Sequence, residues 1–493
     1  MSIPKILHQL WIGPAPRPVT MMATWQAKHP DFEYILWTEE EIVSRGLVVC
    51  PETQAQIDRM EEINGKADIY RWEILHQYGG VFVDADSICV EPLDPLIFFH
   101  PKTVAWAAFE NETERGKLIA TVAMGFVPGH PLCADILSWI RTSPEATDMI
   151  PHYKAWYTVG PGVITRFLET GRYPDFTVFP SHFFLPFHFT GAVYDGHKRV
   201  YAYQEWGTTK NNYADITALE LPEALRDPPA DQWVSILIPA YNTPRQYVRE
   251  CLESIRSQRG SRLGFEVVWV DDGSEPAVAE YMQEELRRFR RTSRFVKVRY
   301  IRHSQNLGVA ESLARGLETC SHPLVARMDA DDVMVAHRLL TQFEYMRSHP
   351  EVPMCGTGIR MFRDDPRGKG GRIWLQDQVF PPVQREAFLE APVPWIMSHP
   401  SLMLRREAIL ALGNYRDVYE TYGLTDPDGR RPILDDFDLE CRVLKAHGEL
   451  HNIPMVLMYY RIHPDQVTYG ATTENTETHR AALGRILEDL GAV

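Results

Sequence analysis

The chain has 493 residues, of which 44% are hydrophobic and 24% charged, and its formal net charge is −15. At about 100–200 residues per domain, this length predicts two to four domains, and the composition excludes wholesale disorder. The acidic charge argues against a nucleic-acid partner, because phosphate contacts require a basic surface. A nucleotide substrate stays open, since a bound metal ion can supply positive charge locally.

The seven cysteines are widely spaced and include no Cys-x-x-Cys pair. This pattern predicts reduced, mostly buried thiols in a cytoplasmic protein, not a disulfide framework or a zinc site. No apolar run approaches the ~20 residues that span a bilayer. We therefore expect no transmembrane segment, while peripheral contact with a membrane stays open.

The first half of the chain alternates short apolar strands with amphipathic helices. Residues 3–13 and 32–37 are strand-like, residues 65–78 have the period of a helix, and residues 80–83 form the next predicted strand. This alternation predicts an α/β fold with a parallel or mixed sheet.

A segment rich in Pro, Asp and Glu, residues 221–231, interrupts this pattern and predicts a linker. We therefore expect one domain over residues 1–220 and a second over residues 232–493. The second half repeats the alternation, with strands at 235–239 and 265–274 and a helix between them at 247–258.

Two predicted buried strands end in a pair of carboxylates one residue apart. Asp84 and Asp86 follow residues 80–83, and Asp329 and Asp331 end a strand in the second half. On an extended backbone such pairs point to the same side, and the carboxyl ends of strands in α/β folds open into a ligand-binding crevice. Crowded carboxylates repel each other and favour Mg²⁺ or Mn²⁺, which takes its other ligands from water and substrate phosphates. The pairs therefore predict metal–diphosphate sites. A solvated acidic turn is the alternative, and recurrence in two halves favours function.

The first half resembles glycosyltransferase family 32, the Asp-x-Asp sugar-binding group related to the clostridial toxin glucosyltransferases. The resemblance is carried by "IPKILHQLWIG" at 3–13, "GKADIYRWEILHQYGGVFVDAD" at 65–86 and "TVGPGVITRFL" at 158–168. It implies that Trp11 stacks on the base of a nucleotide-sugar donor and that Asp68 and Arg71 grip its ribose and sugar. It also implies that Asp84 binds the donor and Asp86 a metal ion. For Asp68 and Arg71 the alternative is a surface ion pair, worth little.

The segment "YQEWGTTKNN" at 203–212 departs from this family, which usually has His-His-Trp and a later Ser-x-Trp element there. Gln204 and Glu205 replace the histidines, and Lys210 replaces the last aromatic residue. We expect Glu205 to bind the metal ion and Thr209 to stand in for the serine. The family is retaining, so the resemblance implies no general base in this domain.

The second half resembles glycosyltransferase family 2. The matching strings are "VSILIPAYN" (234–242), "VVWVDDGS" (267–274), "DADD" (329–332), "SHPSLMLRRE" (398–407), "DDFDLE" (435–440) and "YYRIHPDQVT" (459–468). The resemblance implies a base pocket of Pro239, Tyr241 and Asp272, and a diphosphate–metal pair of Asp329 and Asp331.

Two further residues of the second half have roles implied by the same resemblance. Asp436 would be the catalytic base, which inverting transfer needs because the attacking hydroxyl must lose its proton. The alternative for Asp435 and Asp436 is a helix N-cap with first-turn acids. His463 would be a further metal ligand, and a satisfied structural histidine is the alternative.

Both families have the GT-A fold, a Rossmann-like nucleotide-binding mixed sheet. The resemblances thus imply two tandem GT-A domains, retaining over 1–220 and inverting over 232–493, each with one Mn²⁺ or Mg²⁺ ion. We expect a bifunctional glycosyltransferase of glycan or polysaccharide biosynthesis, with UDP-sugars as the first expectation for the donor and GDP-sugars as the alternative. The acceptor would be a glycan, glycolipid or glycoprotein. Alternatively, only the second domain is catalytic and the first is a degenerate sugar-nucleotide-binding or scaffold module.

Overall fold

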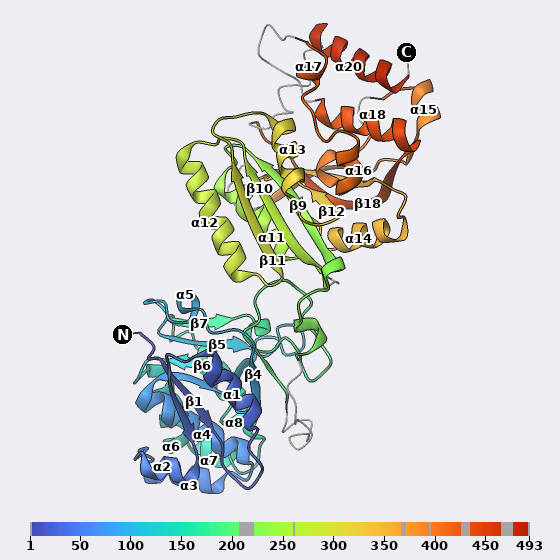
Figure 1. Ribbon diagram of the computed structural model, residues 1–493. Coiled ribbons are helices and arrows are strands. Elements are labelled where there is room, and N and C mark those ends of the chain that lie inside the picture. Colours follow the sequence, from blue (N-terminus) through green and yellow to red (C-terminus); the bar gives the residue numbers. More distant parts are fainter. Residues whose placement is uncertain are drawn as a thin grey trace. The chain divides into compact units, whose positions relative to one another are not determined.

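The computed structural model describes residues 2–206, 221–259, 262–365, 371–393, 396–424, 434–464 and 477–491. The chain divides into two compact units (Figure 1). The first contains Met1–Tyr194 and Arg199–Pro222, and the second contains Asp195–Lys198 and Glu223–Val493. The predicted linker, 221–231, holds two short 3₁₀ turns, one at Glu223–Leu225 and one beginning at Ala230.

The first unit is built on a six-stranded mixed sheet in the order β2-β1-β3-β6-β5-β7. Its strands are β1 (Ile6–Leu10), β2 (Glu33–Trp37), β3 (Gly80–Val83), β5 (Ala105–Phe109), β6 (Ile119–Phe126) and β7 (Phe176–Phe179), and a separate pair is formed by β4 (Ser87–Cys89) and β8 (Ala202–Gln204). Its α-helices are α1 (Val19–Lys28), α2 (Glu39–Ser44), α3 (Pro51–Arg59), α4 (Ile63–Tyr78), α5 (Pro95–Phe98), α6 (Pro131–Thr142), α7 (Pro144–Met149), α8 (Ala155–Thr158) and α9 (Pro161–Glu169).

Apolar side chains alternate across this sheet and form one core on each face. Phe82 of β3 packs with residues of α3, α4 and α6, while Val81 and Val83 pack with residues of α1 and α5. Period-two alternation of this kind is what a strand covered on both faces requires. The helix predicted at 65–78 lies within α4, and the strand predicted at 80–83 is β3.

The chain reverses from α4 into β3 at two glycines, which places the first acid pair. Gly79 and Gly80 have φ of 63° and 85°, a left-handed backbone that side chains other than glycine rarely adopt. A Cβ atom on Gly79 would lie 2.6 Å from a carbon of Pro128. The Gly-Gly pair therefore allows the helix that carries Asp68 and Arg71 to lead directly into the strand that ends before Asp84.

The second unit is built on a larger mixed sheet in the order β11-β10-β9-β12-β17-β14-β18-β13, with β15 on β14 and β16 on β18. Its strands are β9 (Trp233–Ala240), β10 (Gly264–Asp271), β11 (Val296–Arg302), β12 (Leu324–Arg327), β13 (Val333–Met334), β14 (Met354–Asp364), β15 (Arg372–Gln378), β16 (Val383–Gln384), β17 (Met403–Arg405) and β18 (Glu449–Arg461). Its α-helices are α11 (Arg245–Arg256), α12 (Pro276–Thr292), α13 (Val309–Thr319), α14 (Arg338–Ser348), α15 (Arg385–Glu390), α16 (Arg406–Ala411), α17 (Val418–Thr421), α18 (Asp435–His447) and α20 (Glu477–Leu490).

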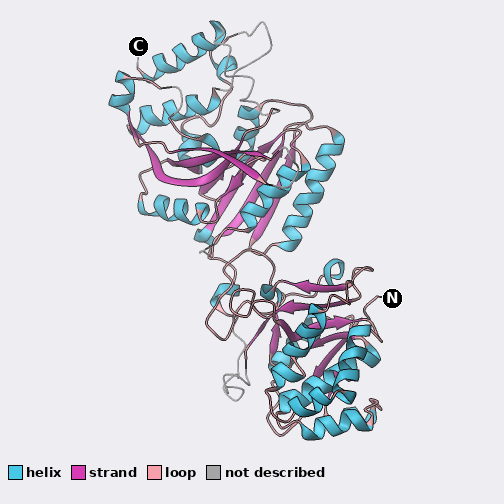
Figure 2. Ribbon diagram, turned by 180° about the vertical axis from the view of Figure 1, so that it is seen from behind, coloured by secondary structure: helices cyan, strands magenta, loops and turns pink. Residues whose placement is uncertain are grey.

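Helices cover both faces of this sheet as well (Figure 2). Ile236 and Ile238 of β9 belong to a core with α11, α12 and α14, and Leu237 between them belongs to a core with α13, α18 and α20. Both units thus have the α/β architecture with a mixed sheet that the sequence predicts. The strand predicted to reach residue 274 ends at Asp271, because the chain turns at Gly273, where φ is 75°.

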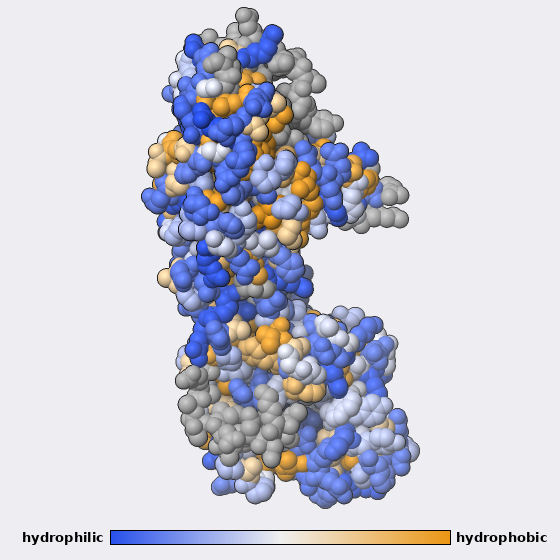
Figure 3. All heavy atoms as spheres, turned by 90° about the vertical axis from the view of Figure 1, so that its right-hand side faces the viewer, coloured by the Kyte–Doolittle hydropathy of each residue, from blue (hydrophilic) through white to orange (hydrophobic). Residues whose placement is uncertain are grey.

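The sequence also predicted buried thiols and no transmembrane segment. All seven cysteines are free thiols, and all but Cys50 are buried. None of the helices that the structure describes has the length and hydrophobicity needed to cross a bilayer. On the face drawn in Figure 3, hydrophobic residues form small patches within a mainly hydrophilic surface.

Candidate functional site

The acid pair of the first unit lies in a turn directly after β3. The carbonyl oxygen of Asp84 accepts hydrogen bonds from the backbone N–H of Ser87, at 3.2 Å, and from its hydroxyl, at 2.6 Å. The expectation of an extended backbone at Asp84 and Asp86 was therefore wrong. The reason is that β4 begins at Ser87 and pairs with β8, so the chain has to change direction at once.

Arg71 of α4 joins the two acidic parts of this site. Its Nη2 lies 2.6 Å from Oδ1 of Asp84 and 3.5 Å from Oδ1 of Asp68, and its Nη1 donates to the carbonyl of Thr121. Arg71 and Asp68 are both buried, so a surface ion pair is excluded. Burial raises the pKa of Asp84 to about 7 against the lowering effect of Arg71, and burial raises the pKa of Asp68 to about 6.

These side chains line one pocket with a volume of about 310 Å³. The predicted residues in its wall are Trp11, Asp68, Arg71, Asp84 and Asp86. The structure adds residues that were not predicted, among them Glu110, Trp156, Gln204 and Trp206. A signal for Glu110 was present, because it follows the buried strand β5, as Asp84 follows β3.

The segment at 203–212, which differs from family 32, contacts Asp86. Nε2 of Gln204 donates to Oδ1 of Asp86 at 2.5 Å, and the backbone N–H of Glu205 donates to the carbonyl of Asp86 at 3.2 Å. Within the described ranges, the side chain of Glu205 is in no cluster of three potential metal ligands. Thr209 and Lys210 lie outside the described residues.

The second unit carries a denser acidic turn after β12. The backbone N–H of Asp332 donates to the carbonyl of Asp329 at 3.3 Å. The predicted pair, Asp329 and Asp331, therefore also lies in a turn. Oxygens of Asp329, Asp331 and Asp332 all lie within 4.8 Å of one another. Burial raises the pKa of Asp332 well above its usual value, and the charges of Asp331 and Asp329 raise it further. Asp332, which was not predicted, also has a buried Oδ2 without a partner among the described residues. Three crowded carboxylates, of which Asp332 is buried and the other two half-buried, fit a divalent cation.

Two arginines and a histidine hold this turn. Nη1 of Arg327 lies 2.7 Å from Oδ2 of Asp329. Arg461, at the end of β18, donates from Nε to the carbonyl of Asp331 at 2.7 Å and from its backbone N–H to Oδ1 of Asp332 at 2.8 Å. His463 follows two residues later, and its Nε2 lies 2.8 Å from Oδ2 of Asp331. His463 is the residue that was predicted to be a further metal ligand.

The two acid turns are therefore held in the same way. In each unit an arginine contacts the first aspartate, Arg71 in one and Arg327 in the other. A second side chain contacts the second aspartate of each turn. In the first unit it is Gln204, at the end of β8, and in the second unit it is His463, just after β18.

The predicted catalytic base, Asp436, lies in the first turn of helix α18. Asp436 is half-buried, and its Oδ1 accepts from the backbone N–H of Phe437 at 2.7 Å. Burial raises the pKa of Asp329, and the charges of Asp331 and Asp436 add to this effect. Burial and the charge of Asp436 raise the pKa of Asp435 to about 8. The alternative of an aspartate N-cap was wrong, because Leu434 occupies the cap without a side-chain hydrogen bond; both acids lie in the first turn.

Asp272, one of the three residues predicted to bind the nucleotide base, is used for contacts within the protein. Oδ1 of Asp272 accepts from the backbone N–H of Leu307 at 2.7 Å and lies 2.9 Å from Nδ1 of His303, and Oδ2 accepts from Gly308 at 2.9 Å. Asp272 therefore clamps the loop before α13. Pro239 is buried at the end of β9 and Tyr241 is half-exposed beyond it. Base binding by these three residues stays a prediction.

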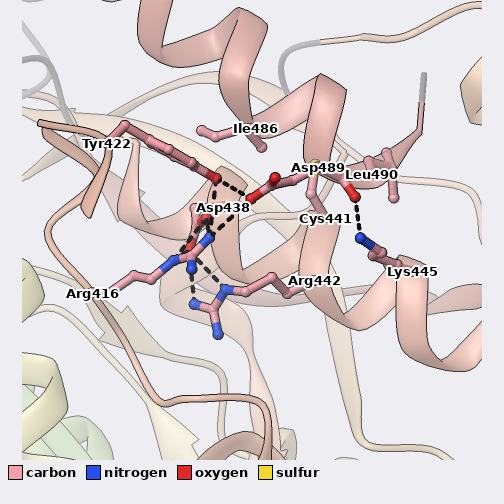
Figure 4. Close-up of a pocket in the computed structure, with 9 residues that line it drawn as sticks. All are labelled: Arg416, Tyr422, Asp438, Cys441, Arg442, Lys445, Ile486, Asp489 and Leu490. Carbon is pink, nitrogen blue, oxygen red and sulfur yellow. Dashed lines mark hydrogen bonds and ion pairs between the residues drawn. The ribbon is translucent and has the colours of Figure 1, made fainter. Parts of the chain in front are cut away.

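A second pocket, of about 180 Å³, lies between α18 and α20 and contains none of the predicted site residues. Its polar side chains pair with one another (Figure 4): Asp438 accepts from Arg416 and Arg442, and the hydroxyl of Tyr422 donates to Asp489. This network attaches α20 to α18.

Two protein-family models match the chain. Residues 235–413 match the model described as "Glycosyl transferase family 2", and residues 16–101 match "Glycosyltransferase sugar-binding region containing DXD motif". Both resemblances inferred from the motifs are confirmed, and the two acid turns lie within the matched residues. Asp436 and His463 lie beyond them.

Several known proteins are similar to parts of the chain. "Amylovoran biosynthesis glycosyltransferase AmsE" of Erwinia amylovora is 29% identical over 234 residues, which are 47% of this chain and 77% of that protein. "Inositol phosphoceramide mannosyltransferase 3" of Schizosaccharomyces pombe is 32% identical over 164 residues, 32% of this chain but only 43% of that protein. A solved structure of mannosyltransferase PcManGT from Pyrobaculum calidifontis, in complex with GDP-Man and Mn²⁺, has a TM-score of 0.34 and 16% identity over 48% of this chain and 58% of that one. That structural similarity is too low to assign a fold.

Proposed function

The chain is a glycosyltransferase with a family 2 domain over residues 235–413 and a DXD-containing sugar-binding region over residues 16–101, and from this premise we propose that it makes two sugar transfers, one at each acid turn. Residues 1–220 and 232–493 would be two tandem GT-A domains, each taking a nucleotide-sugar donor. The observation that carries the proposal is the recurrence of one arrangement. In each unit an Asp-x-Asp turn follows a buried strand, and a buried arginine holds its first aspartate.

In the second domain, Asp331, Asp332 and His463 would hold a divalent cation and Asp329 the donor diphosphate. When bound, the cation neutralises charge on the departing nucleoside diphosphate. Asp436 would accept the proton of the acceptor hydroxyl as that oxygen bonds to the anomeric carbon and the bond to the diphosphate breaks, with inversion. The charges of Asp331 and Asp436 add to burial in raising the pKa of Asp329, and this electrostatic interaction supports the role, because base and donor have to meet at one carbon.

In the first domain, donor binding is supported by the pocket that the predicted residues line together. Trp11 would stack on the nucleotide base, and Asp68, Arg71 and Asp84 would bind the ribose and the sugar. Asp86 and Glu205 would hold the cation, and transfer would proceed with retention and without a general base. Arg71 would limit the rise in the pKa of Asp84 that burial causes.

Donor and acceptor classes follow from the relatives. We propose UDP-sugars first and GDP-sugars second, and relatives named mannosyltransferases favour testing GDP-mannose. Relatives are named for synthesis of amylovoran, of O-antigen and of mannosylated inositol phosphoceramides, which supports a glycan or glycolipid acceptor in glycan biosynthesis.

A second candidate is a chain in which only the family 2 domain is catalytic. The observation that favours it is the amide of Gln204, which donates to Asp86 where a metal ligand is expected. The first domain would then bind a sugar nucleotide without transferring the sugar.

The test uses the full chain with a panel of UDP- and GDP-sugars, Mn²⁺ and oligosaccharide acceptors, and follows nucleotide release and product mass. D84N/D86N should abolish one transfer and D329N/D331N the other, and excess EDTA should stop both. If D84N/D86N leaves every transfer intact, the second candidate is correct. Full activity in EDTA would contradict the metal assignment.

A further inference from the structure

Helix α8 and the residues before it hold exposed aromatic rings at the mouth of the first unit's pocket. Tyr153, Trp156 and Tyr157 are 56%, 44% and 41% exposed, and Trp156 is also part of the pocket wall. The rings of Trp156 and Tyr157 are 5.6 Å apart, and those of Tyr153 and Tyr157 are 6.4 Å apart. We call these three residues the aromatic shelf. Large exposed aromatic groups gathered in one place usually mark a binding surface.

The shelf is held firmly in its exposed position. Glu62, at the start of α4, accepts from the backbone N–H of Ala155 at 2.6 Å and from Nζ of Lys154 at 2.7 Å. Behind α8, the indole N–H of the buried Trp72 donates to the carbonyl of Val159 at 2.7 Å. The rings are therefore exposed because the fold presents them, and not because the segment is loosely packed.

The shelf also adjoins the residues proposed to grip the donor sugar. A Cβ atom on Gly160 would lie 2.5 Å from Oδ2 of Asp68 and 3.4 Å from the Cα of Trp156. The absence of a side chain at Gly160 thus lets the backbone of Trp156 approach Asp68, which contacts Arg71. In a transfer reaction the acceptor hydroxyl has to reach the anomeric carbon of the donor. An acceptor has to lie beside Asp68 and Arg71, where the shelf is.

The chemistry of the shelf fits a neutral sugar ring. The flat faces of Trp and Tyr match the C–H face of a pyranose, and their N–H and O–H groups suit its hydroxyls. Within the described part of the chain, the indole N–H of Trp156 and the amide of Asn64, another residue of the pocket wall, have no protein hydrogen-bond partner, so both are available to hydroxyls. The guanidinium of Arg115 lies 5.0 Å from the Trp156 ring but is paired with Glu110 at 3.2 Å, which lowers its attraction for a phosphate.

We propose that the aromatic shelf is the acceptor subsite of the first unit and binds a neutral pyranose by stacking on Trp156. This assignment rests on the proposed transfer in that unit and adds the chemical class of its acceptor. Tyr153 and Tyr157 extend the surface beyond one ring, so an oligosaccharide end would bind more tightly than a single sugar.

The test measures binding of methyl glucoside, galactoside and mannoside and their disaccharides to the full chain by saturation-transfer NMR and calorimetry, with UDP or GDP and Mn²⁺ present. We expect Trp156→Ala to weaken the best glycoside about tenfold or more, as truncation of a central aromatic anchor does, and Trp156→Phe to retain most of the affinity. Nucleotide affinity should stay within about twofold of wild type in both variants. Trp374→Ala is the matched control, since that tryptophan is 47% exposed in the second unit.

Three outcomes with glycosides and nucleotides would overturn the subsite, and a fourth concerns lipid. The three are glycoside binding that is equal in wild type and Trp156→Ala, no glycoside binding by the wild type, and loss of nucleotide affinity together with glycoside affinity. Binding to phosphatidylinositol vesicles that Trp156→Ala alone abolishes, with glycoside binding unchanged, would also overturn it in favour of a lipid surface. Failure of the proposed function is separable, because D84N/D86N would then leave every transfer intact while Trp156→Ala still weakens glycoside binding.

Discussion

Asp436 is the side chain on which the proposed inverting transfer depends. Asparagine at this position keeps an acceptor for the N–H of Phe437 but cannot take a proton. We expect Asp436→Asn to lower turnover in the second domain about 10²–10⁴-fold, the usual size of general-base catalysis. Donor and Mn²⁺ affinity should barely change, because in the proposed site Asp329 and Asp331, not Asp436, would bind those. The measurement is kinetics at saturating donor beside calorimetry, and activity lost only through lost donor binding would place the base elsewhere.

Asp435, its neighbour, makes folding stability depend on pH. Burial, and then the charge of Asp436, raise its pKa from 3.8 to about 8 in the folded state. A raised carboxyl pKa contributes stability that is complete below about pH 4 and is lost as the pH rises through about 8. Asparagine stays neutral throughout. We therefore expect the unfolding free energy of Asp435→Asn, relative to wild type, to increase from pH 5 to pH 9 by at least about 1 kcal/mol. Urea unfolding in EDTA at both pH values measures this, and a difference that does not change with pH would contradict it.

At the scale of elements, the network of Figure 4 joins α18, which begins with these acids, to α20. The Asp438 side chain is 1% exposed and accepts from Arg416 at 2.6 Å and from Arg442 at 2.8 Å. Asp438→Ala would remove the buried carboxylate that Arg416 and Arg442 share, and would leave Arg416, among the described acidic residues, only the exposed Asp489 at 3.9 Å. Breaking a buried pair costs about 3–5 kcal/mol, and the lower end applies because Arg416 is 29% exposed.

Glu488→Ala is the control, since its pair with Arg485 on α20 is exposed and should be worth less than about 1 kcal/mol. Urea unfolding of the second unit compares the two variants. If they lose equal amounts of stability, the buried network does not hold α20 in place.

For the whole molecule, the division into two units predicts separable folding, because each unit has its own cores. Fragments 1–222 and 223–493 should each unfold cooperatively. The second fragment lacks Asp195–Lys198, in which buried His197 lies 2.9 Å from the carbonyl of Leu263 and packs on Phe265. We therefore expect the fragment to melt below the second unit of the full chain, and His197→Ala to lower the same transition. Calorimetry checks both, and a failure of either fragment to fold would show that the units depend on each other.

Much of this protein was determined by local sequence. The period of residues 65–78 predicted α4, the apolar run at 80–83 predicted β3, and the Asp-x-Asp endings identified both acid turns. Side-chain periodicity and strand-ending carboxylates are local properties, so they can be recognised without knowing which strands are neighbours.

Only the tertiary structure decided how these residues are partnered. Arg461 and His463 reach the turn at Asp331 across more than 100 residues of chain because β18 lies between β14 and β13 in the sheet. Burial of the Asp68–Arg71 pair, the inclusion of Asp332 and the aromatic shelf beside Asp68 likewise depend on packing between distant segments. Strand order in a mixed sheet does not follow the order of the chain, and side-chain periodicity carries no record of it. The sequence therefore determined where the acidic turns are, and the fold decided which groups hold them.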